Sequence, residues 1–217
     1  MNDGFKITDK IDTLLTTDRS VQRSKATGLL IQGLTQTVER IDPDFLLVVG
    51  DREESIAAAV VGNYMEKLVV HIGGGDPVYG NADDPIRFAV SKLAHIHCCT
   101  TQEYADNLKK IGEETFRIFH TGNPSLDNIK NTKELSTENL SEKLGCQLPN
   151  NGYIILIKHP FSSEKNKTDS HIRQTLESLK YFCCKHKYKV IGIYPNTDPG
   201  SYEIINVLEE YEQNESF

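Results

Sequence analysis

Apolar positions in the first half of the chain alternate between the period of a helix and that of a buried strand. From residue 19 to residue 41, apolar side chains recur at three- and four-residue intervals, which predicts a helix that ends before Pro43. The next run, FLLVV at residues 45–49, is continuously apolar, as expected of a parallel strand buried on both faces. The alternation continues and predicts helix 53–64, strand 68–72, a helix from Asp84, strand 96–99, a helix that ends at Gly112, and strand 116–119. This order indicates a parallel sheet with helices on both faces.

A polar segment at residues 123–151 separates this unit from a second one. It contains GNPSLDN and one short expected helix at residues 138–144, and we interpret it as a hinge. Beyond it the pattern predicts strand 153–157, helix 172–186, strand 190–194 and helix 201–211. We therefore expect two α/β domains, at residues 1–122 and 123–217. Both are expected to be incomplete Rossmann-like parallel-sheet domains, because the first has no opening strand with a phosphate-binding turn and the second stops after two strands.

Composition and charge exclude several classes of protein. A net charge of −7 without a basic stripe argues against a nucleic-acid binder and against binding to a membrane surface. No apolar run approaches the roughly 20 residues that a membrane span requires, and the polar, acidic start of the chain is not typical of a signal peptide. None of the five cysteines forms a C-x-x-C pair, so we expect free thiols in a reducing cytosol and a cytoplasmic location.

Polar residues and glycines follow the predicted strands, at the end of the sheet where doubly wound folds bind ligands. They are Asp51 and Arg52, the segment GGGD at residues 73–76 with Asp76, Asn123, His159, and the segment PNTDPGS at residues 195–201 with Asn196 and Ser201. Glycines allow a ligand to approach the backbone, and helix N-termini offer N–H groups to phosphate. A cleft between two such units suits a nucleotide-linked substrate.

Several of these features also have a structural interpretation. The glycine run fits a tight turn between a strand and a helix. Asp84, which precedes Pro85, is predicted to be a helix N-cap, and Thr100 with Glu103 has the spacing of a capping box. Three histidines, His71, His95 and His97, invite a metal interpretation, but no further ligand set has the right spacing. We therefore predict no metal site.

The segments GDREE, HIGGGD, DDPIRFAVSKLAHIHCCTTQEY, HTGNPSLDN, IKHPF and YPNTDPGS, in this order and spacing, resemble the UDP-N-acetylglucosamine 2-epimerase family. The resemblance runs from about residue 43 to residue 202 and is closest to the hydrolysing branch that feeds sialic and related nonulosonic acid synthesis. It implies two Rossmann-like domains that face each other across a cleft, the glycosyltransferase-B arrangement. It also implies activity without a metal or a nicotinamide cofactor, dimers, and a chain that is partial, because the domain pair of the family is much longer.

The resemblance implies a concrete reaction on UDP-N-acetylglucosamine or a related UDP-diacetamido sugar. A carboxylate removes the proton at C2 while UDP leaves from C1, and water then adds to the unsaturated glycal to give a free N-acetylmannosamine-type sugar and UDP. On the pattern of the family, Asp51 is a catalytic carboxylate and Asp83, or its neighbour Asp84, is a second. The resemblance also implies that Arg52, His159 and Asn196 hold the nucleotide diphosphate, and we add Asn123 and Ser201 as substrate-binding candidates from their positions at the strand ends.

One position departs from the family. Many relatives have glutamate or histidine where this chain has Gly73, and glycine cannot transfer a proton. The acid/base set therefore lacks a member unless Asp76, which is close in sequence, replaces it.

Two other functions stay open at this point. The chain is alternatively an inactive nucleotide-sugar-binding or regulatory fragment of the family, or a two-domain glycosyltransferase, which the GDR, HIGGG and DD series disfavours. The epimerase interpretation requires Asp51 and His159, from different domains, to converge on one pocket.

Overall fold

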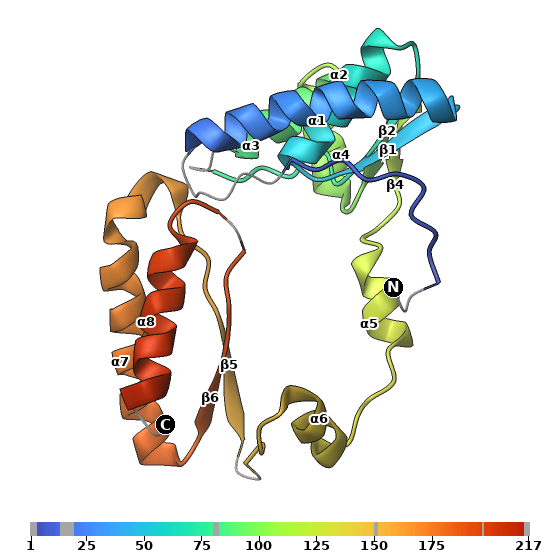
Figure 1. Cartoon of the computed structure of the whole chain (residues 1–217). Helices are drawn as coiled ribbons and strands as arrows, with labels where there is room; N and C mark the ends of the chain where they lie inside the picture. Colours follow the sequence, from blue (N-terminus) through green and yellow to red (C-terminus); the bar gives the residue numbers. More distant parts are fainter. Residues whose placement is uncertain (1–3, 14–19, 80–82, 150–151, 197, 215–217) are drawn as a thin grey trace. The chain divides into compact units, whose positions relative to one another are not determined.

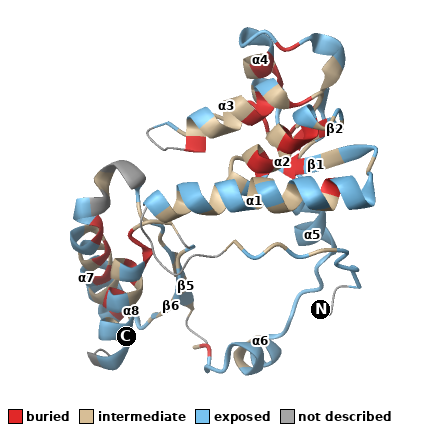
Figure 2. Ribbon diagram, turned by 45° about the horizontal axis from the view of Figure 1, so that its top comes forward, coloured by how far each residue is buried: buried red, intermediate tan, exposed pale blue. Residues whose placement is uncertain are grey.

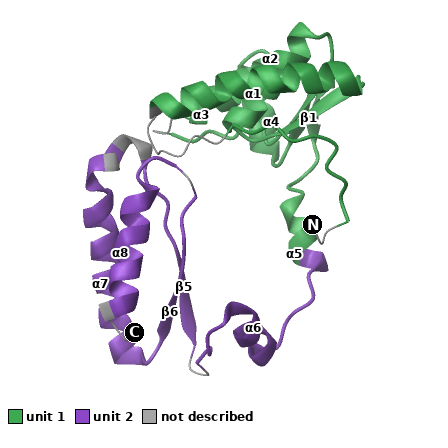
Figure 3. Cartoon of the chain, in the orientation of Figure 1, with its two compact units in different colours: residues 1–129 green, residues 130–217 purple. Residues whose placement is uncertain are grey.

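The structure, a computed structural model, describes residues 4–13, 20–79, 83–149, 152–196 and 198–214. It divides into two compact units, unit 1 at residues 1–129 and unit 2 at residues 130–217 (Figure 3). Each unit has its own parallel sheet. Among the described helices, none is long and apolar enough to cross a membrane.

Unit 1 alternates helices and strands, as the periodicity predicts (Figure 1). Its elements are α1 (Ser20–Ile41), β1 (Phe45–Val49), α2 (Glu53–Tyr64), β2 (Leu68–Ile72), α3 (Asp83–Leu93), β3 (Ile96–Cys99), α4 (Gln102–Lys110), the 3-10 turn η1 (Thr115–Arg117), β4 (Ile118–His120) and α5 (Ser125–Asn131), which crosses the boundary between the units. The strands lie in the order β1-β2-β3-β4, and all neighbouring pairs are parallel.

Helices α2, α3 and α4 pack on one face of this sheet. The register places Val48, His71, His97 and Ile118 in one row and therefore on one face. The buried core residues that lie against that face are Ala59, Val90, Ala94, Ala105 and Leu108. Figure 2 shows buried segments on α2, α3 and α4.

The prediction of helices on both faces is wrong for the described part of unit 1. The strand order never reverses, and right-handed crossovers between successive neighbours place every connecting helix on the same side. The opposite face stays open at β1, where Phe45, Leu47 and Val49 are 57%, 59% and 60% exposed.

Two predicted helix caps are also wrong. Helix α3 begins at Asp83, so that Asp84 lies in its first turn, where its carboxylate accepts a hydrogen bond from the Val78 N–H at 2.7 Å. The N-cap of α4 is Thr101 instead of Thr100, and its hydroxyl accepts from the Tyr104 N–H at 3.2 Å. Both differences are of one residue, which is the usual uncertainty of a helix boundary taken from sequence.

Unit 2 is smaller and also α/β. Its elements are α6 (Thr137–Leu144), β5 (Tyr153–Ile157), the 3-10 segment η2 (Ser162–Lys167), α7 (Thr168–His186), β6 (Lys189–Ile193) and α8 (Ser201–Asn214). Strands β5 and β6 pair in parallel, and α7 and α8 lie side by side (Figure 1). Their core consists of Ile172, Leu176, Ile204 and Val207. This packing fixes the loops after β5 and β6, which carry the candidate residues of unit 2.

Candidate functional site

Arg87 of α3 joins two of the candidate acids of unit 1. Its Nη2 donates to Asp51, just after β1, and its Nη1 lies 3.1 Å from an Asp76 carboxylate oxygen in the loop after β2. The same nitrogen donates to the Gly73 carbonyl at 3.0 Å. The Arg87 and Asp51 side chains are only 11% and 16% exposed, whereas Asp76 is 34% exposed, so one largely buried cation is shared between a buried and a half-exposed carboxylate.

The loop that carries Asp76 is tightly packed. Gly75 has φ +80°, and a Cβ atom there would overlap the Tyr104 carbonyl of α4. Asn107 donates from its side chain to the Gly75 carbonyl at 3.0 Å. The hydrogen bond from the Tyr104 hydroxyl to Asp76 raises the pKa of that tyrosine. Asp76 is therefore held from α3 and from α4, and the glycine run is more than a loose turn.

The space at Gly73 is open. Its φ is +80°, and the nearest atom that an added Cβ would meet is the Gly50 nitrogen at 3.9 Å. A ligand atom or a side chain therefore has room beside the Asp51–Arg87–Asp76 group.

His71 stabilises the turn that carries Asp51 by a hydrogen bond to the main chain. Its ring is fully buried; Nε2 donates to the Gly50 carbonyl at 2.9 Å, and Nδ1 lies 3.2 Å from the Ser91 hydroxyl. Burial lowers the pKa of His71 from its ordinary 6.5 to about 4, so the ring is neutral at pH 7. Among the described residues, no group of three or more His, Cys, Asp or Glu side chains is arranged to hold a metal ion.

Asp51 and Asp83 line one cavity of about 280 Å³ between α1, α2 and α3. Asp83 begins α3, and its carboxylate accepts from Arg23 Nη2 at 3.0 Å. Arg23 also contacts Glu53 at the start of α2. The other residues that line the cavity are Ser24, Thr27, Ile56 and Ile86. The structure thus brings Asp51, Asp76 and Asp83 into one region of unit 1.

Arg52 and Asn123 lie in the same unit with local contacts. Arg52 occupies the N-cap position of α2, its side chain is 38% exposed, and its Nε lies 3.5 Å from Glu53. The Asn123 side chain accepts from the Ser125 N–H at 2.9 Å, which closes the turn before α5. Substrate binding by either residue stays a prediction.

The candidates of unit 2 gather at the ends of β5 and β6. The Asn196 N–H donates to His159 Nδ1 at 3.1 Å, so the neutral ring carries its proton on Nε2. The Asn196 side chain donates to Asp198 at 2.6 Å, and the Ser201 N–H donates to the Asp198 carbonyl at 3.0 Å where α8 begins. Ser201 itself is buried. Because Asp51 and His159 belong to different units, their convergence stays a prediction.

The sequence profile of one family matches residues 1–217, and its description is UDP-N-acetylglucosamine 2-epimerase. The chain belongs to the UDP-N-acetylglucosamine 2-epimerase family. A relative from Neisseria meningitidis serogroup B, described by the same name, is 33% identical over 187 residues, which are 86% of this chain and 48% of that protein. A second, from Campylobacter jejuni, described as GDP/UDP-N,N'-diacetylbacillosamine 2-epimerase (hydrolyzing), is 31% identical over 98% of this chain and 54% of that protein. The chain thus spans about half the length of the curated relatives it matches.

Solved structures of the UDP-N-acetylglucosamine 2-epimerase family share the fold. The crystal structure of the Neisseria meningitidis enzyme bound to UDP-GlcNAc matches 90% of this chain and 54% of that one, with a TM-score of 0.70 at 21% identity. The Methanocaldococcus jannaschii enzyme in complex with UDP-GlcNAc and UDP matches 88% of this chain with a TM-score of 0.69 at 17% identity. These similarities confirm the α/β fold with parallel sheets.

Sequence reasoning about this epimerase-family chain missed both arginines of the site. Arg87 lies 36 positions from Asp51 and 11 positions from Asp76, and neither separation is a spacing that predicts a pair. Arg23 lies sixty positions from Asp83, and no spacing rule connects them.

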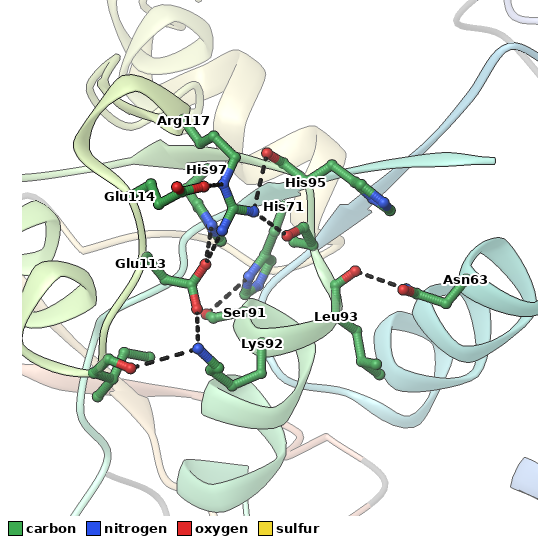
Figure 4. Close-up of polar contacts among 12 residues, drawn as sticks. Asn63, His71, Ser91, Lys92, Leu93, His95, His97, Glu113, Glu114 and Arg117 are labelled. Carbon is green, nitrogen blue, oxygen red and sulfur yellow. Dashed lines mark hydrogen bonds and ion pairs between the residues drawn. The ribbon is translucent and has the colours of Figure 1, made fainter. Parts of the chain in front are cut away.

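A second group is centred on the buried Glu113 (Figure 4). Its partner Arg117 is four residues further along the chain, whereas Lys92 and His97 are 21 and 16 residues away. The Glu113 side chain is 1% exposed and lies 2.6 Å from Lys92 Nζ, 3.1 Å from His97 Nε2 and 2.9 Å from Arg117 Nη2. Burial acts to raise the pKa of Glu113, but the hydrogen bond and the charge of Lys92, together with the hydrogen bond from His97, outweigh it, and the pKa is lowered. We assign this group to the attachment of the segment 113–117 to α3 and β3.

Proposed function

We propose that the whole protein is a hydrolysing 2-epimerase of UDP-N-acetylglucosamine or of a related UDP-diacetamido sugar. The observation that carries the proposal is the cluster in unit 1: Asp51 and Asp76 share Arg87, and Asp51 lines the same cavity as Asp83. Family membership and the two relatives described above support the substrate class. We further propose two Rossmann-like domains of the glycosyltransferase-B type, of which this chain carries a part of each.

The reaction needs two proton transfers at C2 of the sugar, and the carboxylates supply them. In the first step a carboxylate takes the C2 proton, the electrons of the C–H bond form the C1–C2 double bond, and the C1–O bond breaks to release UDP. In the second step water adds at C1 and a proton returns to C2 from the opposite face. Asp51 and Asp83, on the wall of one cavity, are the two groups that we assign to these transfers.

The cavity suits the sugar better than the diphosphate. Of the charged residues that line it, Asp51, Glu53 and Asp83 are acids and Arg23 is the cation. Such a wall repels phosphate, whereas its apolar residues Ile56 and Ile86 offer contacts to an acetamido group.

Unit 2 provides groups that can bind the departing UDP. His159 presents an Nε2–H donor in its neutral form because Nδ1 accepts from Asn196. The loop with Asn196 leads directly into α8, whose first residue is Ser201, and a helix N-terminus favours an anion. We therefore propose that His159, Asn196 and the start of α8 bind UDP, and that the two units converge on one substrate.

UDP release from the sugar nucleotide tests the proposal. The chain is incubated with UDP-N-acetylglucosamine and separately with UDP-2,4-diacetamido-2,4,6-trideoxyglucose, and products are identified by NMR. We expect UDP and the free 2-epimeric sugar, with a rate reduced at least about 100-fold by Asp51→Asn. Asp106→Asn, on the exposed surface of α4, is the matched control and should leave the rate unchanged. A UDP-bound epimer instead of free sugar would overturn the hydrolysing assignment.

Gly73 favours a second candidate, a nucleotide-sugar-binding or regulatory protein without turnover. Glycine offers no carboxylate or imidazole at this position, and without a substitute such as Asp76 the acid/base set lacks a member. Calorimetric binding of UDP-N-acetylglucosamine in the absence of UDP release would support this candidate over the enzyme.

A further inference from the structure

Arg23 connects three helices at the wall of the cavity. It lies on α1, its Nε contacts Glu53, the first residue of α2, and its Nη2 lies 3.0 Å from Asp83, the first residue of α3. The side chains of Arg23, Glu53 and Asp83 are 29%, 20% and 12% exposed. These are partly buried pairs, in which geometry is better defined than in surface ion pairs.

The two contacts use different nitrogens of one rigid guanidinium group. A planar group that is bound at two points fixes the direction of both partners, which a flexible ammonium group cannot do. The Asp83 carboxylate is therefore oriented from α1, an element that precedes it by sixty residues. Arg87 does the same for Asp51 and Asp76, so each of the two arginines orients a pair of acids.

We propose that Arg23 is the positioning residue for Asp83, and that it holds this carboxylate on the wall of the cavity in the direction needed for proton transfer. The proposal rests on the proposed function, because it takes Asp83 to be one of the two proton-transferring groups. The charged groups around the pair are Asp51 from the turn after β1, Glu53 from the start of α2, Asp84 and Arg87 from α3, and Arg52, which pairs with Glu53.

The kinetic test compares Arg23→Gln and Arg23→Lys with Arg40→Gln in the 217-residue chain. Arg40 is on the same helix and also pairs with a carboxylate, Asp9, but its side chain is 61% exposed. We expect both Arg23 variants to lower kcat for UDP release about 10- to 100-fold, with KM changed by less than about threefold, because a misdirected carboxylate slows proton transfer more than it weakens binding. Arg40→Gln should match the unsubstituted chain. A kcat of Arg23→Gln within about twofold of the control would overturn the proposal.

A spectroscopic readout separates failure of this proposal from failure of the proposed function. The side-chain carboxyl carbon of Asp83 is observed by NMR at pH 7 and assigned by its disappearance in Asp83→Asn. We expect this signal to move in Arg23→Gln and Arg23→Lys and to stay in place in Arg40→Gln. If the unsubstituted chain releases no UDP, the proposed function fails for this chain, and the NMR signal alone decides about the contact. An unmoved Asp83 signal in Arg23→Gln overturns the positioning role, and the lysine variant gives the answer if the glutamine variant does not fold.

Discussion

His71 donates its Nε2 proton to the carbonyl oxygen of Gly50, 2.9 Å away, and so fixes the turn in which β1 ends and Asp51 begins. The ring is completely buried between the sheet and α3, where Ser91 contacts its second nitrogen at 3.2 Å. A neutral buried histidine that holds the backbone next to a candidate catalytic acid connects stability at low pH with the integrity of the site.

We expect the free energy of unfolding to fall as the pH falls from about 6.5 to about 4. Burial lowers the pKa of His71 from 6.5 to about 4, so the unfolded chain binds this proton more readily than the folded chain does. The contribution of His71 to the free energy of unfolding is fully present above pH 6.5. It is lost progressively as the pH falls to about 4, and the total loss is about 3 kcal/mol. Urea denaturation of the chain at a series of pH values measures it.

His71→Gln is the informative variant for this pH dependence. Glutamine keeps an N–H donor for the Gly50 carbonyl but does not titrate, so the slope between pH 6.5 and 4 should become shallower. Some slope will remain, because burial also lowers the pKa of His97 and the pKa of Glu113 is lowered. The exposed His120→Gln is the control, and a slope equally shallow in both variants would contradict the assignment to His71.

Replacement of Arg87 by methionine should destabilise unit 1 and abolish activity. The change leaves Asp51 and Asp76 without the cation that they share. Removal of one partner of a largely buried ion pair typically lowers the free energy of unfolding by about 3–5 kcal/mol. Thermal and urea unfolding measure the loss. Arg173→Met is the control, since this arginine also pairs with two carboxylates, Asp169 and Glu210, but on the exposed surface, and its effect should be much smaller.

A double-mutant cycle refines this test. If the cost of Arg87→Met arises from the stranded charge, Asp51→Asn in the same chain should recover part of the lost stability, because the amide removes that charge. Additive effects of the two substitutions would show that Arg87 acts through its packing instead.

The sequence predicted most elements well because each of them follows a regular apolar stripe or run. Strands β1, β2, β3 and β5 have the predicted bounds because polar residues or glycines lie on both sides of each run, and the bounds of α2 are also as predicted. The proximity of Asp51 and Asp76 also follows from sequence, because both come directly after adjacent parallel strands. These are local properties, or direct consequences of a parallel pairing.

Properties that depend on packing between distant elements were not predictable. The face on which a helix packs depends on the spatial order of the strands, and the monotonic order β1-β2-β3-β4 left one face without the helices expected there. The partners of Arg23, and the partners Lys92 and His97 of Glu113, lie on other elements and depend on the reach of long side chains. Neither kind of contact has a fixed sequence spacing.

Gly75→Ala should destabilise the loop of Asp76 far more than an alanine at another left-handed glycine does. The added methyl group would overlap the Tyr104 carbonyl, and main-chain atoms of α4 cannot move aside cheaply. Gly112 has φ +91° and no atom within 4 Å of an added Cβ, so Gly112→Ala measures the backbone strain alone. We expect Gly75→Ala to cost about 1–3 kcal/mol more than Gly112→Ala in urea denaturation. Equal costs would mean that the loop is not pressed against α4.

Gly73→Glu should increase the rate of UDP release. The resemblance to the family implies a proton-transferring side chain at this position, and the space beside Gly73 is open, with the Gly50 nitrogen 3.9 Å from an added Cβ. The backbone at φ +80° makes any side chain there cost about 1 kcal/mol of stability, which is small enough for the chain to stay folded. Gly73→Gln has the same size and the same strain but cannot transfer a proton, so it is the matched control. A gain in kcat with glutamate and not with glutamine assigns the effect to the carboxyl group. If both variants are slower than the unsubstituted chain, Asp76 already fills the role and the open space is needed for the sugar instead.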